Sequence, residues 1–143
     1  MTVGLLHGCA TFILTGLIWV IQLVHYPMFR FLDPKKHTKA MQFHQSRISF
    51  LVVPLMLFEL FSGVYLAILE WPILATFHVM NLSLIGIIWV HTFGLMVPFH
   101  RDITHSMDEP LLNQTLRHHW IRTVAWTIKT LVWVAIIWHL LPN

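Results

Sequence analysis

Two ionisable residues, Glu59 and Lys129, interrupt long apolar stretches of this 143-residue sequence. Each lies about eleven residues into its stretch, which places the two side chains at similar depth if both stretches are helices that start from the same side. A charge inside a bilayer is expensive unless it is paired. We therefore expect a Glu59–Lys129 ion pair. Two roles are open for it: a pair that fixes helix register, or a carboxylate that handles protons or binds a substrate.

Histidine is unusually abundant, with eleven copies in the chain. Two levels are expected in a helical bundle: His7, His78 and His139 near one end, and His25, His91, His118 and His119 in the other half. Neutral imidazoles at two levels are how transmembrane b-type cytochromes hold haem. His25, His78 and His91 are thus candidate cofactor ligands, with His25 and His91 also candidates for a metal. The alternative is interfacial histidines solvated by lipid headgroups.

The remaining histidines, His37, His44, His100 and His105, fall in or beside predicted loops, where surface histidines are common. The sequence has no HExxH motif, no ExxH pair and a single cysteine, Cys9. It therefore predicts neither a zinc or di-iron carboxylate site nor an internal disulfide.

Polar residues gather at a common depth in one half of the predicted bundle: Gln22, His25, His44, Arg47, Glu59, His91, Arg122 and Lys129. A bundle held together by packing alone does not need so many, so we predict a polar cavity there. Arg122 and Lys129 would meet an anionic group of a ligand, and Glu59 would carry protons. These three residues are the candidate catalytic residues.

Composition indicates the elements that position these residues. The chain is 57% hydrophobic and 10% charged, with a mean hydropathy of +0.69. Apolar stretches near 4–27, 48–70, 75–99 and 118–141 are each long enough to cross a bilayer. We predict an all-α fold: a single transmembrane domain, residues 1–143, built as a bundle of four transmembrane helices. Pro54 predicts a kink in the second helix. Residues 34–46 are expected to form a short interfacial helix, and 102–114 a loop.

The basic residues predict an orientation. Lys and Arg concentrate on or near the two long connections: Arg30, Lys35, Lys36, Lys39, Arg47, Arg101, Arg117 and Arg122. The positive-inside rule then places both connections in the cytoplasm and both termini on the non-cytoplasmic side. Since topology explains the net charge of +3, no nucleic-acid partner is expected. We predict a multi-pass protein of the lipid bilayer, in a bacterial inner (cytoplasmic) membrane.

Three stretches carry a resemblance: WVIQLVHYPMF at 19–29, residues 47–63, and residues 78–91. They resemble the HemJ-type protoporphyrinogen oxidases, and the four-helix outline is similar to the anthrone-oxygenase-like membrane families. The first resemblance implies a small helical bundle that binds haem b and oxidises protoporphyrinogen with a membrane electron acceptor. His78 and His91 would correspond to a histidine pair on that family's third helix. Phe12 and Met80 stand where the family has histidine and lysine.

The sequence thus predicts a small membrane redox protein, an oxidoreductase that binds haem b or a quinone- or porphyrin-like ligand in a polar cavity of the cytoplasmic half. A non-enzymatic small subunit or assembly factor of a larger membrane complex is the alternative, and a homo-oligomer is also open. An ion transporter is less favoured, because the sequence lacks the internal repeats typical of that class.

Overall fold

The computed structural model describes residues 2–70, 74–105 and 108–140. These residues contain four helical spans that are long and apolar enough to cross a membrane: Thr2–Phe31, Lys35–Leu69, Ala75–His105 and Glu109–His139. The described residues contain no strand. The predicted all-α fold with four such helices is therefore confirmed.

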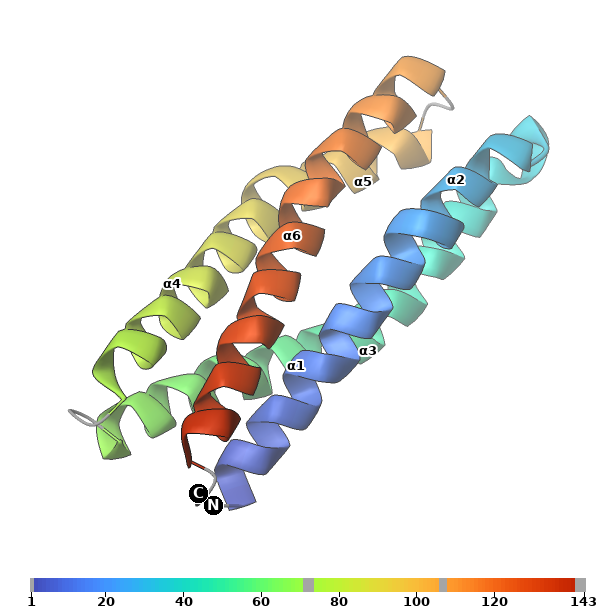
Figure 1. Ribbon diagram of the computed structural model, residues 1–143. Coiled ribbons are helices and arrows are strands. Elements are labelled where there is room, and N and C mark those ends of the chain that lie inside the picture. Colours follow the sequence, from blue (N-terminus) through green and yellow to red (C-terminus); the bar gives the residue numbers. More distant parts are fainter. Residues whose placement is uncertain (1, 71–73, 106–107, 141–143) are drawn as a thin grey trace.

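The four spans lie side by side and alternate in direction along the chain (Figure 1). The beginning of the first span and the end of the fourth lie together at one end of the bundle, here the terminal end. The end of the first span and the start of the second lie at the opposite end, as do the end of the third span and the start of the fourth; this is called here the loop end. Which end faces the cytoplasm stays a prediction.

Two spans are unbroken α-helices, α3 (Pro34–Leu69) and α6 (Glu109–Leu140). The other two change helix type towards the loop end. The first span comprises α1 (Thr2–Val20), a π-helical turn η1 (Ile21–His25), α2 (Tyr26–Met28) and a 3-10 turn η2 (Phe29–Phe31). The third comprises α4 (Ala75–His91), a π-helical turn η3 (Thr92–Met96) and α5 (Val97–His105).

Both π-helical turns end two residues before a proline, Pro27 or Pro98. Proline has no N–H, and its ring crowds the carbonyl four residues earlier. The helix widens at these points, because the backbone hydrogen bonds reach five residues back instead of four. Tyr26 N–H donates to the carbonyl of Ile21, and Val97 N–H donates to the carbonyl of Thr92. Such π-bulges are frequent at functional sites. In contrast, α3 is α-helical on both sides of Pro54.

The predicted boundaries at the loop end were wrong. Residues 34–46 are not a separate interfacial helix but the start of α3, and residues 109–114 belong to α6 rather than to a loop. The Asp33 side chain caps α3 by accepting the Lys35 N–H at 2.9 Å, with Pro34 at the first helical position. Charged residues mark where a helix can meet water, and they do not require it to end.

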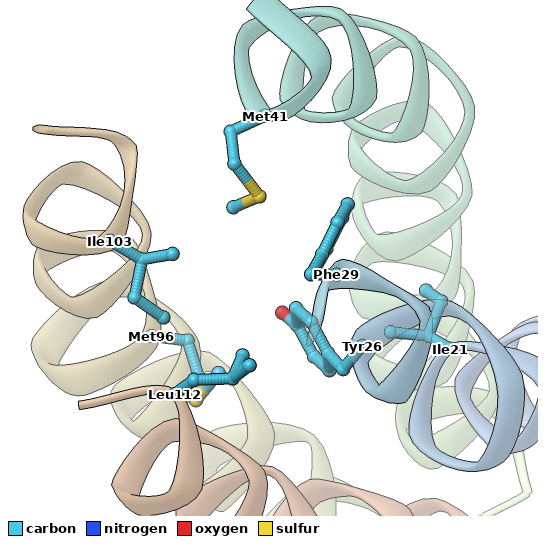
Figure 2. Packing of buried hydrophobic residues seen from close by; sticks show 7 residues of the cluster. All are labelled: Ile21, Tyr26, Phe29, Met41, Met96, Ile103 and Leu112. Carbon is cyan, nitrogen blue, oxygen red and sulfur yellow. The ribbon is translucent and has the colours of Figure 1, made fainter. Parts of the chain in front are cut away.

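Among the described residues, buried apolar side chains form three clusters along the bundle. Figure 2 shows its loop-end cluster, in which the hydroxyl of Tyr26 is directed away from its own helix towards the middle of the cluster. Leu14, Met56 and Trp126 belong to a central cluster. At the terminal end, Gly4 and Gly8 of α1 pack against the indole of Trp133 on α6. The GxxxG pattern formed by Gly4 and Gly8 therefore packs against another helix of the same chain.

Candidate ligand cavity at the loop end

A cavity of about 140 Å³ lies inside the bundle between its middle and the loop end. Its walls are largely apolar, with Leu14, Ile18 and Met56 at the end nearer the middle. Its polar lining comes from several helices: Tyr26, His44, Gln45, His100, His119 and Arg122. An apolar pocket with a few convergent polar groups is the usual form of a small-molecule site.

The π-helical turns position two of these polar groups. Tyr26 follows the first turn, and His100 lies four residues beyond the second. The Tyr26 hydroxyl hydrogen-bonds Nε2 of His100. His119 of α6 packs edge-on against the Tyr26 ring, with centroids 4.8 Å apart, and its Nδ1 lies 2.6 Å from the Gln22 side-chain oxygen. Tyr26, His100 and His119 thus form one connected polar wall.

Arg122 is the charged group of the cavity. It is 6% exposed, and its guanidinium lies 5.5 Å from the centre of the Trp126 ring, a cation–π contact. Its Nε has no hydrogen-bond partner among the described residues. Across residues 2–70, 74–105 and 108–140, no carboxylate comes within ion-pair distance of Arg122. A buried cation without a counter-charge is costly, so this position favours a ligand with an electron-rich oxygen.

The cavity opens sideways through the wall of the bundle. Its lining includes Ser49 and Val53 of α3, and Phe93 and Val97 of the third span, all of which also reach the outer surface. Lipid would cover this surface if the four spans cross a bilayer. A hydrophobic ligand could therefore enter from the membrane between α3 and the third span.

The predicted Glu59–Lys129 pair is confirmed, with Lys129 Nζ 2.6 Å from Glu59 Oε1. Thr11 completes the contact by donating its hydroxyl to Glu59 at 2.7 Å and accepting from Lys129 at 2.8 Å. Neither Glu59 nor Lys129 lines the cavity. Of the three candidate catalytic residues, only Arg122 does.

The candidate cofactor ligands lie at separate places. The ring of His25 stacks on the ring of His44, with centroids 4.1 Å apart. The ring centroids of His91 and His118 lie 6.3 Å apart. His78 is in the terminal half, with its Nε2 2.8 Å from a carboxylate oxygen of Glu70. The part of the chain that the structure describes contains no group of three or more His, Cys, Asp or Glu placed to hold a metal ion.

The cavity also allows a fit test for haem b. A protein cavity of about 150 Å³ accommodates benzene. The cavity here is about 140 Å³, so it is the size of one six-membered ring. A porphyrin contains four pyrrole rings in one macrocycle, and the residues as placed do not fit it.

The sequence predicted His44 and Arg122 for a polar cavity, but it missed the contributions of Tyr26, His100 and His119. His44 and His100 were assigned to loop edges, yet His44 is 8% exposed on α3, and both line the cavity. Two signals pointed to them: prolines shortly before His100 and just after Tyr26, and the three-residue spacing of His119 and Arg122 on one helix face.

No protein-family model, no curated protein and no solved structure matches this chain. The resemblance to the HemJ-type oxidases therefore stays a prediction, and the candidate site rests on the geometry above.

Proposed function

We propose that this chain is a small membrane redox protein that binds the ring of a quinone-like ligand in its loop-end cavity. The observation that carries the proposal is Arg122, a buried guanidinium without a carboxylate partner among the described residues, beside a ring-sized cavity. A guanidinium donates to a carbonyl oxygen and attracts the negative charge that a quinone oxygen gains on reduction.

Size and access support a quinone over haem b or a porphyrin. The volume of about 140 Å³ suits a single ring. The opening between α3 and the third span would let an isoprenoid tail stay in lipid while the headgroup enters. When bound, the quinone supplies the redox chemistry. The chain binds and orients the ring, with Arg122 at one oxygen and the polar wall of Tyr26, His100 and His119 beside it.

The charges of the loop end support a location of the cavity on the cytoplasmic side of the membrane. The Lys and Arg residues near the two loop-end connections favour a cytoplasmic loop end. The cavity would then lie in the cytoplasmic half of a bacterial inner membrane.

Titration of the full chain in lipid nanodiscs with a short-tail ubiquinone, followed by calorimetry, tests the proposal. Arg122→Gln should weaken binding roughly tenfold to a hundredfold, the effect of one lost charge-assisted hydrogen bond. Arg117→Gln is the matched control, because Arg117 lies on the same helix but is exposed and does not line the cavity. Equal affinity of the wild type and Arg122→Gln would overturn the proposal.

Haem titration of the same preparation separates the alternatives. A Soret band that grows with added haem and disappears in His25→Ala or His91→Ala would favour the haem protein over the quinone protein. Binding of neither quinone nor haem would favour the non-enzymatic subunit of a larger membrane complex.

A further inference from the structure

A second buried polar cluster lies in the terminal half of the bundle, apart from the loop-end cavity. It contains His7 of α1, His78 and Asn81 of α4, and Trp133 of α6, which are 0%, 0%, 1% and 4% exposed. The rings of His7 and Trp133 lie 4.8 Å apart. A methyl group added at Gly63 would be 3.2 Å from both His7 Cε1 and Asn81 Nδ2, so these two side chains flank one point. We call this group the terminal cluster.

Hydrogen bonds to its neighbours assign the protons of both imidazoles. The Ser62 hydroxyl donates to the Phe58 carbonyl at 2.6 Å, so its oxygen accepts from His7 Nδ1–H at 2.7 Å. His78 Nε2–H donates to Glu70 at 2.8 Å. In the neutral rings, His7 Nε2 and His78 Nδ1 are then bare acceptors.

Among the described residues, the remaining polar atoms of the terminal cluster make no hydrogen bond of normal geometry, although the Asn81 amide lies beside the His7 ring. These atoms are His7 Nε2, His78 Nδ1, both amide atoms of Asn81, and Trp133 Nε1. Leaving so many buried donors and acceptors unpaired would be strongly unfavourable. His7 Nε2, His78 Nδ1 and the Asn81 side-chain oxygen accept hydrogen bonds, whereas the Asn81 amide nitrogen donates them. Trp133 Nε1 also donates, but it faces Gly8 of α1. A water molecule donates two hydrogen bonds and accepts two, so it can pair with both imidazole nitrogens and with the Asn81 amide nitrogen.

Three helices connect the terminal cluster to the mid-bundle ion pair. One helical turn towards the loop end leads from His7 to Thr11 on α1, from Ser62 to Glu59 on α3, and from Trp133 to Lys129 on α6. One turn advances about 5.4 Å, which is about the length of two successive hydrogen bonds through one water molecule. At the other side, Glu70 reaches the surface, with 32% of its side chain exposed.

We propose that the terminal cluster binds water and exchanges the protons of that water with the surface through the carboxylate of Glu70. An excess proton on the bound water forms an N–H bond at His78 Nδ1. The Nε2 proton of the resulting imidazolium then passes to the Glu70 carboxylate, and from there to bulk water. The reverse transfers restore the original tautomer. No electron moves, and the path is independent of the quinone proposal.

Solid-state NMR of the full chain in lipid bilayers tests the bound water. With 15N-labelled histidine, magnetisation should transfer from water protons to the His7 and His78 ring nitrogens, whose signals His7→Phe and His78→Phe identify. Asn81→Leu removes the amide nitrogen that pairs with the water, so it should abolish the transfer to His7. Ser83→Leu is the control, because Ser83 is exposed on the same helix. Absence of water transfer in the wild type would overturn the proposal.

Proton exchange tests the path itself. In deuterated buffer, the His7 ring N–H should exchange more slowly in Glu70→Gln than in the wild type, because the amide does not relay the proton. Glu109→Gln, an exposed glutamate at the loop end, should leave the rate unchanged. Equal rates in the wild type and Glu70→Gln would show exchange by general opening of the bundle and would overturn the path.

Discussion

Lys129 Nζ lies 2.6 Å from Glu59 Oε1, with both side chains almost fully buried between α3 and α6. Thr11 of α1 bonds both charged groups, so three helices meet in a closed polar contact. This contact fixes the relative height of α1, α3 and α6, because a shift of any one helix would leave a charge unpaired. It supports a register role for the pair.

Replacing one partner of this pair should destabilise the protein much more than replacing both partners. Glu59→Gln and Lys129→Met each leave one buried group without its partner and should each lower the free energy of unfolding by about 3–5 kcal/mol. The double variant should recover most of this loss. Thermal unfolding in detergent, followed by circular dichroism, measures the three variants. Additive losses in the double variant would contradict the pairing argument.

The glycines of the first helix should differ in their tolerance of alanine. At Gly8 an added methyl group would overlap Nε1 and Cδ1 of Trp133, whereas at Gly16 it would meet no described residue within 4 Å. Gly8→Ala should therefore lower the midpoint of thermal unfolding. Gly16→Ala should leave it unchanged or raise it, since alanine favours a helix by about 1 kcal/mol over glycine. Equal midpoints would mean that α1 and α6 do not pack as described.

The chain's two tyrosines should differ in their effect on quinone binding, because only Tyr26 belongs to the polar wall of the cavity. Tyr26→Phe removes the hydroxyl that bonds His100 at the cavity and should weaken quinone binding by roughly threefold to tenfold, as for one neutral hydrogen bond. Tyr65→Phe changes an exposed tyrosine on α3 and should bind like the wild type. Calorimetric titration measures both. A similar affinity for all three proteins would place the ligand elsewhere.

Orientation can be tested with single cysteines. In a Cys9→Ala background, which removes the one native thiol, Thr2→Cys places a thiol at the terminal end and His105→Cys places one at the loop end. The positive-inside rule predicts that an impermeant maleimide labels Thr2→Cys in intact cells. It should label His105→Cys only after permeabilisation. The reverse pattern would invert the topology and move the cavity to the outer half.

The number of spans and the central ion pair could both be predicted from the sequence, and the reason is the same for both. A bilayer requires about 20 apolar residues per span and tolerates a buried charge only with a partner. Four apolar stretches and the matched depths of Glu59 and Lys129 therefore predicted the bundle and the pair that the structure shows. Helix ends at the loop end were not readable, since a helix such as α3 continues with polar residues beyond its apolar stretch.

Only the tertiary structure decided which side chains share the cavity. Tyr26, His100 and His119 come together because two spans with π-helical turns and one unbroken helix, α6, converge. The sequence shows only the prolines that accompany those turns. The predicted set of His25, His78 and His91 was separated for the same reason: each ring is placed by the helix packed against it. Depth in a membrane follows from sequence position along a helix, whereas contact across a bundle depends on how each helix is rotated about its axis.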